Sequence, residues 1–231
     1  GGVRLGFDGA QDYDLVLRAA TLDDDLARAR SLITGAFAAQ FEQTARDVIV
    51  PARREQSFTV TAEVTPHHLL LTDEAARGYD TRFKVNPPLR RDDDVRALRA
   101  ALADGTIDIV ATDHAPHPIE SKEVAWQEAS FGMVGLESAL GVVQHAMVDD
   151  GLLSWADVAR VLSRTPAAIG GLDGYAAPFE VGSPAHLTLY DPAASGVFEL
   201  SRLRGMSVNS PYLGRELPGR VVATIHGGVP T

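Results

Sequence analysis

Residues 107–117 have the sequence IDIVATDHAPH, in which an apolar run ends directly in a carboxylate and two histidines. The run 107–112 is mostly apolar, which is typical of a parallel strand buried on both faces. In parallel α/β folds, ligand sites lie at the carboxyl ends of the strands. The carboxylate of Asp113, with imidazoles one and four residues later, could therefore bind a metal ion, transfer protons or do both. A plain strand end, with Asp113 capping a turn and both histidines solvated, is the alternative.

The preceding segments predict a strand and a helix that lead into this run. Residues 58–64 alternate β-branched side chains and stop at Thr65-Pro66, which indicates a strand. Residues 92–103 form a predicted helix, and the turn-forming pair Asp104-Gly105 joins it to the strand at 107–112. The order strand, helix, strand with short links favours a parallel α/β unit.

Two further helices and two late strands are predicted after residue 117. One helix extends from about residue 135 to residue 147. Another begins after Ser154, where Ser154 and Asp157 resemble a capping box. Residues 184–190 and 219–226 are short and β-rich, and they fall outside the helix–strand alternation. We expect these two strands to pair in a small β unit of their own.

The first 57 residues have a different pattern. A strand is predicted at 13–18, and a helix is predicted from Thr21, where apolar residues repeat at helical spacing. A short strand is predicted at 47–50. None of these elements carries a recognisable chemical motif, so the role of residues 1–57 is left unassigned.

The composition excludes several classes of function. The 231 residues carry a net charge of −10, and the basic residues are scattered, which argues against nucleic acid as a partner. No apolar run is long enough to span a membrane, and the first residues lack the apolar core of a signal peptide. There are no cysteines, so disulfides and thiolate ligands are excluded, and a cytoplasmic protein is the expectation.

Two other segments suggest ligand contacts. In the sequence VNPPLR at 85–90, two prolines follow Asn86 and could hold its amide rigidly toward a ligand. In the sequence FGMVGLE at 131–137, Gly132 precedes a predicted helix and lets the backbone approach a bound molecule closely. An ordinary rigid loop and an ordinary helix start are the respective alternatives.

Taken together, these segments resemble dihydroorotases, which are cyclic amidohydrolases of the amidohydrolase superfamily. The combination of Asn-Pro-Pro-Leu-Arg with Asp-His-Ala-Pro-His favours dihydroorotases over the related hydantoinases and allantoinases. The resemblance covers roughly residues 58–231 and is carried by the segments 61–69, 86–90, 111–117, 131–137 and 207–217.

The resemblance implies a fold and a division of the chain. Dihydroorotases have a (β/α)₈ TIM barrel with a small β-sandwich formed from both chain ends. Residues 58–64 would be the seventh barrel strand and residues 107–112 the eighth. We therefore expect an α/β fold containing a partial or modified barrel unit. Its expected parts are an unassigned segment at 1–57, a barrel-like amidohydrolase portion at 58–175 and a small β-sandwich portion at 176–231.

The resemblance also implies roles for site residues. Asp113 would be the catalytic carboxylate, which ligates zinc and takes a proton from the attacking hydroxide. Asn86 and His117 would bind the carboxylate or ring of the substrate, helped by the backbone near Gly132. We expect Asn86, Asp113 and His117 to cluster at the carboxyl ends of neighbouring parallel strands. For His67 and His68 we expect packing or hydrogen bonding next to the site without contact to the metal, and for His114 a structural role.

The chain departs from the family pattern in its metal ligands. Members of the family have a His-X-His on the first barrel strand followed by a substrate-binding arginine, a bridging Lys or Asp, and one histidine on each of strands five and six. Residues 1–66 contain no histidine at all. All seven histidines stand at positions 67, 68, 114, 117, 145, 186 and 226.

Three hypotheses follow from this departure. The chain is a truncated, rearranged or degenerate zinc-dependent dihydroorotase that acts on dihydroorotate and carbamoyl aspartate in pyrimidine biosynthesis. Alternatively, it is a non-catalytic dihydroorotase-like partner that stabilises another enzyme, such as aspartate transcarbamoylase, or it forms a homo-oligomer. As a third possibility, residues 1–57 close a different α/β fold, and the remnants of the site are idle or bind another small molecule.

Overall fold

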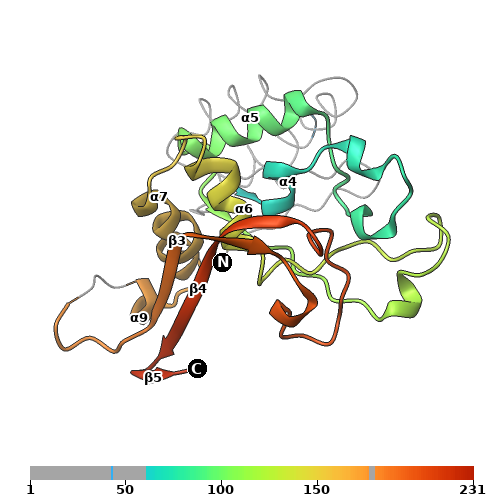
Figure 1. Cartoon of the computed structure of the whole chain (residues 1–231). Helices are drawn as coiled ribbons and strands as arrows, with labels where there is room; N and C mark the ends of the chain where they lie inside the picture. Colours follow the sequence, from blue (N-terminus) through green and yellow to red (C-terminus); the bar gives the residue numbers. More distant parts are fainter. Residues whose placement is uncertain (1–42, 44–60, 177–179) are drawn as a thin grey trace.

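The computed structural model describes residue 43 and residues 61–176 and 180–231. The elements predicted at 13–18, from Thr21 and at 47–50 lie outside these residues. Within the described part, a two-stranded parallel sheet and a three-stranded antiparallel sheet are joined by short helices (Figure 1). The fold is therefore mixed α/β, as predicted.

The parallel sheet pairs β1 (Glu63–Val64) with β2 (Ile109–Val110). Both strands are shorter than the sequence predicts, although residues 58–60 lie outside the described part. The prediction of a strand over 107–112 was wrong at its ends. The amide of Ile107 donates to Ala101 at the end of the preceding helix, and Asp113 leaves the strand with a positive φ of 47°.

Helices α4 (Pro66–Leu70) and α5 (Asp92–Ala103) connect the two strands. The Thr65 side chain accepts from the amide of His68, so the strand stop predicted at Thr65-Pro66 is also the cap of α4. Helix α5 has the predicted bounds, and three aspartates in its first turn complement the positive end of the helix dipole. Between these helices lie the 3₁₀ turns η2 (Asp73–Ala76) and η3 (Thr81–Phe83).

After β2 and the 3₁₀ turn η4 (Ile119–Ser121), the chain forms α6 (Ala139–Val143), which continues as the π-helical turn η5 (Gln144–Val148). The predicted start near residue 135 was wrong, because the amides of Gly135 and Leu136 donate to the His114 ring instead of opening a helix. The capping box at Ser154 is confirmed at the start of α7. The remaining helical elements are α7 (Trp155–Ala159), η6 (Arg160–Arg164), α8 (Thr165–Ile169) and α9 (Asp173–Ala176).

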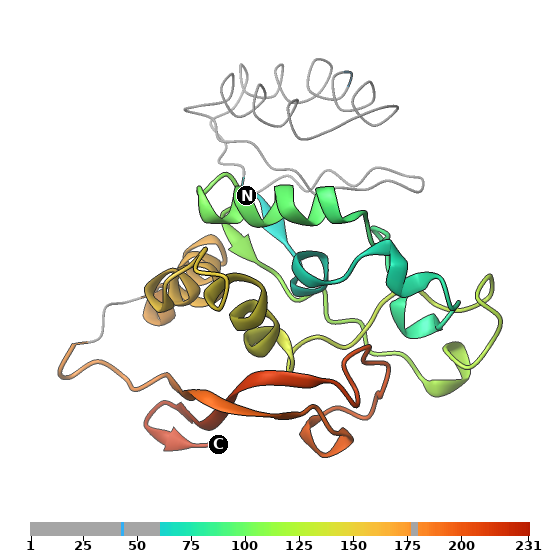
Figure 2. The ribbon, with the colours of Figure 1, turned by 45° about the horizontal axis from the view of Figure 1, so that its top comes forward.

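The antiparallel sheet consists of β3 (Leu187–Val197), β4 (Glu216–His226) and β5 (Val229–Pro230), with η7 (Leu200–Arg202) between the first two. The predicted pairing of 184–190 with 219–226 is confirmed, although β3 begins at Leu187. Figure 2 shows this sheet lying against one side of the helices. The Tyr190 hydroxyl donates to the Gln144 amide oxygen at 2.6 Å and so ties β3 to η5.

Two apolar clusters hold these layers together. The first lies among β1, β2, α5 and the helices after α6, and its largest buried members include Leu69, Leu102, Met147 and Val161. The second joins the 83–89 segment to the C-terminal third of the chain through Phe83, Met133, Phe198 and Tyr212. No helix in the described part of the chain has the length and apolar character needed to cross a bilayer.

We predict that Gly219→Ala destabilises the chain more than Gly227→Ala does. Both glycines have positive φ, 72° and 58°, so an added side chain strains the backbone in both variants and this strain cancels in the comparison. A Cβ at Gly219 would collide with the Tyr190 hydroxyl and the Gln144 amide, whereas a Cβ at Gly227 meets nothing within 4 Å. Losing the Tyr190–Gln144 bond should cost about 1–3 kcal/mol beyond the control. Urea unfolding measures this difference, and equal losses for the two variants would contradict it.

Candidate active site

His67 and Asp113 meet where β1 and β2 end. His67 is 2% exposed, and its Nε2 atom lies 4.0 Å from Oδ2 of Asp113. Within the described residues that nitrogen has no hydrogen-bond partner, although buried side-chain nitrogens normally have one. Burial, with a smaller contribution from His68, lowers the pKa of His67 well below its usual value. The ring is therefore neutral at pH 7, which is the form that binds a metal ion.

Asp113 adopts a backbone conformation that is unusual for a side-chain-bearing residue. Its φ of 47° lies in the left-handed region, which aspartate tolerates better than most residues. Its side chain is 46% exposed, so the carboxylate is open to solvent on one side and faces His67 on the other. Such conformations cost about 1–3 kcal/mol and concentrate at functional sites. The geometry suits a carboxylate that contacts both a metal ion and a substrate.

His68 connects the end of β1 to the loop that carries Asn86. Its Nδ1 atom lies 2.7 Å from the Thr65 hydroxyl, and its Nε2 atom lies 3.1 Å from the carbonyl oxygen of Pro87 and 3.3 Å from that of Pro88. Because carbonyls only accept, Nε2 carries the proton and donates to the loop. Asn86 is exposed beside this anchor. That Asn86, Asp113 and His117 contact one ligand stays a prediction.

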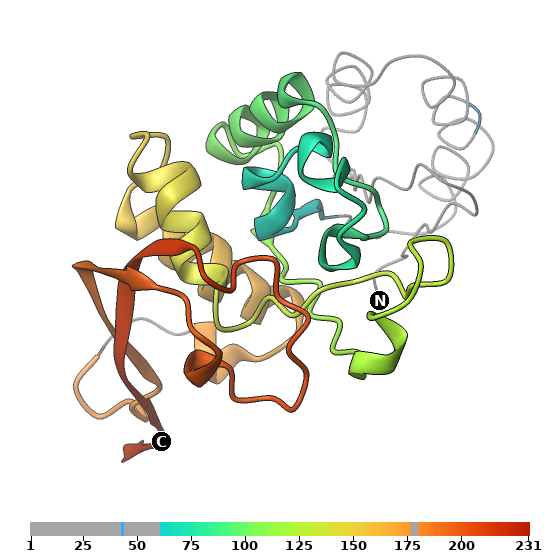
Figure 3. The ribbon, with the colours of Figure 1, turned by 45° about the vertical axis from the view of Figure 1, so that its right-hand side comes forward.

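The loop after β2 folds against the segment that contains Gly132. Nε2 of His117 lies 2.7 Å from the carbonyl oxygen of Phe131. The buried side chain of Asn209 accepts from the amide of His117 and donates to the carbonyls of Ala115 and Gly132. Figure 3 shows the green-to-yellow segment after β2 between the teal α4–η3 region and the orange C-terminal segment. Asn209 is a positioning residue that the sequence reasoning did not single out.

Position 132 requires a glycine because of its backbone conformation and its close neighbours. Its φ is 118°, and a Cβ would collide with the Ala115 side chain and lie 3.3 Å from Nε2 of His117. Its amide donates to Lys84 at 2.8 Å, and its carbonyl accepts from Lys122 and Asn209. The close approach expected of this glycine is thus made to the chain itself, and its contact with substrate stays a prediction.

Two buried lysines border the same segment. Lys84 is 7% exposed and Lys122 is 5% exposed, whereas lysines are almost never this buried without partners. Burial, and secondarily the charge of Lys84, lowers the pKa of Lys122 to about 8, and Asp80 opposes the shift. Asp80 is itself paired with Arg82 through its carboxylate. The charged form of Lys122 is therefore disfavoured in the folded chain.

The residues present fit part of a zinc site. In residues 61–176 and 180–231, no three histidine, cysteine or acidic side chains gather closely enough to hold a metal ion. Zinc takes at least three protein ligands at catalytic sites. The unpartnered Nε2 of His67 and the carboxylate of Asp113 supply two. The sequence analysis assigned His67 a packing or hydrogen-bonding role and no contact with the metal. The available signal was its position directly after a predicted strand and Pro66.

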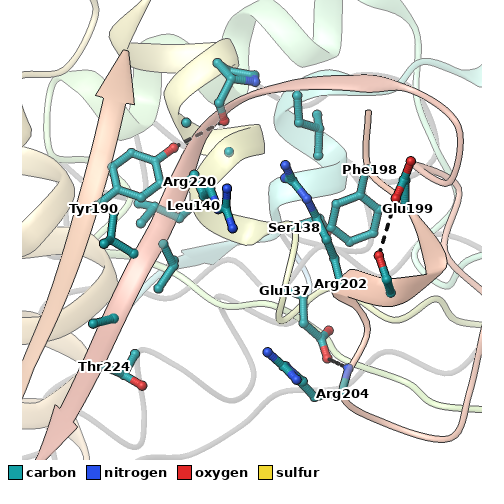
Figure 4. Close-up of a pocket in the computed structure, with 18 of the residues that line it drawn as sticks. Glu137, Ser138, Leu140, Tyr190, Phe198, Glu199, Arg202, Arg204, Arg220 and Thr224 are labelled. Atoms are coloured by element: carbon teal, nitrogen blue, oxygen red, sulfur yellow. Dashed lines mark hydrogen bonds between the residues drawn. The ribbon is translucent and has the colours of Figure 1, made fainter. Parts of the chain in front are cut away.

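A groove of about 1000 Å³ lies elsewhere, between α6 and the β3–β4 pair (Figure 4). Glu137, Tyr190, Phe198 and Arg220 are among its lining residues. Its lining includes none of Asn86, Asp113, His117 and Gly132, so the candidate active site is not placed there.

Comparison with family models matches residues 52–230 to the amidohydrolase family. The chain belongs to this family. It is similar to a dihydroorotase of Leifsonia xyli subsp. xyli, at 65% identity over 77% of this chain and 41% of the relative. A dihydroorotase of Mycobacterium leprae is 47% identical over 97% of this chain and 52% of the relative. An L-hydantoinase (dihydropyrimidinase) of Arthrobacter aurescens matches in structure, with a TM-score of 0.68 and 30% identity over 74% of this chain and 38% of that chain. The chain thus spans about half or less of the length of these relatives.

We predict that replacing Lys122 by methionine changes how stability depends on pH in this amidohydrolase. Between pH 8 and pH 10.5 the folded chain binds fewer protons at Lys122 than the unfolded chain does, since the pKa is about 8 against 10.5. Stability contributed by this group therefore rises with pH through that window. The free energy of unfolding of the parent, relative to Lys122→Met, should rise by on the order of 3 kcal/mol. Urea unfolding from pH 7 to pH 10 measures the trend, and a flat or falling difference would contradict it.

Proposed function

We propose that this chain forms one wall of a dihydroorotase active site, which interconverts dihydroorotate and carbamoyl aspartate with the help of zinc. One observation carries the proposal: the unpartnered Nε2 of buried His67 faces the carboxylate of Asp113, 4.0 Å away, where two paired parallel strands end. The similarity to bacterial dihydroorotases supports the choice of reaction. The similarity covers only part of each relative, so substrate and activity are inferred for the whole site.

The chemistry of such a site explains why these residue types meet. When bound, zinc polarises the amide carbonyl and lowers the pKa of water so that hydroxide forms near neutral pH. His67 and Asp113 would hold the ion from the strand ends. Asp113 would also take the proton of the attacking nucleophile and deliver it to the leaving ring nitrogen. Its partly exposed position gives it access to both.

The other proposed contacts orient the substrate. Asn86 would bind the carboxylate or ring from the loop that His68 anchors, and His117 would bind from the loop after β2. Gly132 would support this side through the backbone. In the family, the arginine that clamps the substrate carboxylate follows a His-X-His, and this sequence contains no His-X-His. Without that bidentate contact, the contacts named here would bind substrate weakly.

We expect the isolated chain to bind zinc weakly and to hydrolyse dihydroorotate negligibly. Two ligands cannot complete a three-ligand site, and groups that act as a unit fail together. Calorimetric titration of zinc should show weak binding that His67→Gln and Asp113→Asn each reduce by at least about tenfold. His145→Gln is the control, because His145 lies exposed on η5 and its ion pair among the described residues is with Asp149.

One outcome would overturn the proposal, and another would overturn the expectation of weak zinc binding and negligible activity. Zinc binding that is insensitive to both site variants would remove the metal from this site and favour the non-catalytic alternative. Stoichiometric zinc with a turnover that Asp113→Ala abolishes would keep the reaction but show that further ligands come from residues not considered.

A further inference from the structure

Five backbone carbonyls of one loop converge on two buried ammonium groups. Nζ of Lys84 donates to Trp126 at 2.7 Å, Gln127 at 3.2 Å and Ala129 at 2.7 Å. Nζ of Lys122 donates to Ser130 at 2.8 Å and Gly132 at 2.9 Å. Side-chain cations thus bind the carbonyls of residues 126–132, while amides of the same loop have backbone partners, such as the carbonyl of Ser121 for Ser130. Hydrogen bonds from charged donors are roughly twice as strong as neutral ones.

The same two lysines surround Phe131 from several sides. The carbonyl of Lys84 accepts from the amide of Gly132, directly after Phe131, at 2.8 Å. Nζ of Lys84 also lies 4.5 Å from the centre of the Phe131 ring, within reach of a cation–π contact. Carbonyls on both sides of Phe131, at Ser130 and Gly132, are bound by Lys122. The backbone carbonyl of Lys84 thus holds the Phe131–Gly132 peptide directly, and the ammonium group of Lys122 holds the carbonyls on either side of Phe131.

The orientation of the Phe131–Gly132 peptide decides the state of the His117 ring. The carbonyl oxygen of Phe131 lies 2.7 Å from Nε2 of His117. Because a carbonyl can only accept, Nε2 must carry the proton. Nδ1 then remains as the ring atom with which His117 can contact a ligand. A rotated Phe131 peptide would release this constraint and leave both nitrogens to solvent.

We propose that Lys84 and Lys122 are positioning residues that fix His117 through the carbonyl of Phe131, so that His117 contacts its ligand through Nδ1. The identity of that ligand as dihydroorotate rests on the proposed function, but the fixing of the ring does not. The burial of Lys122 supports the inference. Burial disfavours the charged form of this side chain, so Lys122 does not serve to stabilise the fold. Its role is better explained by the loop geometry that it fixes.

The test observes the His117 ring in the whole 231-residue chain by nitrogen-15 NMR of labelled histidine, with the signal assigned by its loss in His117→Gln. We expect a protonated Nε2 whose proton exchanges slowly with water. In Lys84→Met and Lys122→Met, which keep the length of the side chain but remove its donors, that proton should exchange at least about tenfold faster.

Arg99→Met is the matched control. Arg99 also donates from a cation to a backbone carbonyl, that of Leu69 at 2.7 Å, and pairs with Asp150, but it does not contact residues 126–132. It should leave the His117 signal unchanged. Circular dichroism reports whether each methionine variant folds. If one does not fold, the glutamine variants of both lysines provide a second pair for the same measurement.

The outcomes separate this inference from the proposed function. A proton on Nδ1 in the parent, or His117 exchange that is unchanged in both folded lysine variants, would overturn the positioning role. Asp113→Asn should weaken zinc binding without altering the His117 signal. Failure of zinc binding alone would therefore count against the dihydroorotase site and leave the inference about Lys84 and Lys122 standing.

Discussion

The parallel pairing of β1 with β2 is the constraint on which the candidate site depends. Val64 stands opposite Val110 in this register, and His67 and Asp113 each lie three residues beyond their member of that pair. Equal offsets past the ends of two parallel strands bring the two side chains to the same edge of the sheet. A shift of one residue would turn the strand faces over and separate them. The apolar cluster around Ala62, Leu102 and Val110 fixes the register, so core packing determines the chemistry at the strand ends.

Beyond the strand ends, buried polar side chains replace regular backbone pairing. His68 holds the carbonyls of Pro87 and Pro88, Asn209 holds those of Ala115 and Gly132, and the two lysines hold residues 126–132. His68, Lys84 and Asn209 link segments at least 19 residues apart, and Lys122 closes a shorter loop. Loops organised in this way need no sheet or helix of their own, which leaves Asn86 and His117 partly open to a ligand.

The sequence predicts those features that depend on local chemistry. The bounds of α5 follow from its three N-terminal aspartates and helical spacing, and the Ser154–Asp157 box follows from two residues three apart. The pairing of β3 with β4 follows from two β-rich stretches of sequence, but the sequence does not predict the full length of either strand. The early start predicted for α6 was wrong because the amide of Gly135 donates to the ring of His114, which lies 21 residues earlier in the chain. The contact of His67 with Asp113 and the buried role of Lys84 were missed for the same reason, since their partners come from distant segments. Lys122 was missed because a lysine in a polar stretch is ordinarily solvated.

Features that oppose folding occur in the candidate site and in the loop that Lys122 holds. Asp113 has a left-handed backbone, Nε2 of His67 is buried without a partner, and the charge of Lys122 is disfavoured by burial. Local rules of stability are broken mainly where function requires a particular geometry. Helix α5 and the apolar cluster beneath it satisfy those rules, and their packing offsets this cost. The placement of strain, more than any single motif, therefore supports the proposal of a site at the strand ends and the lysine-held loop.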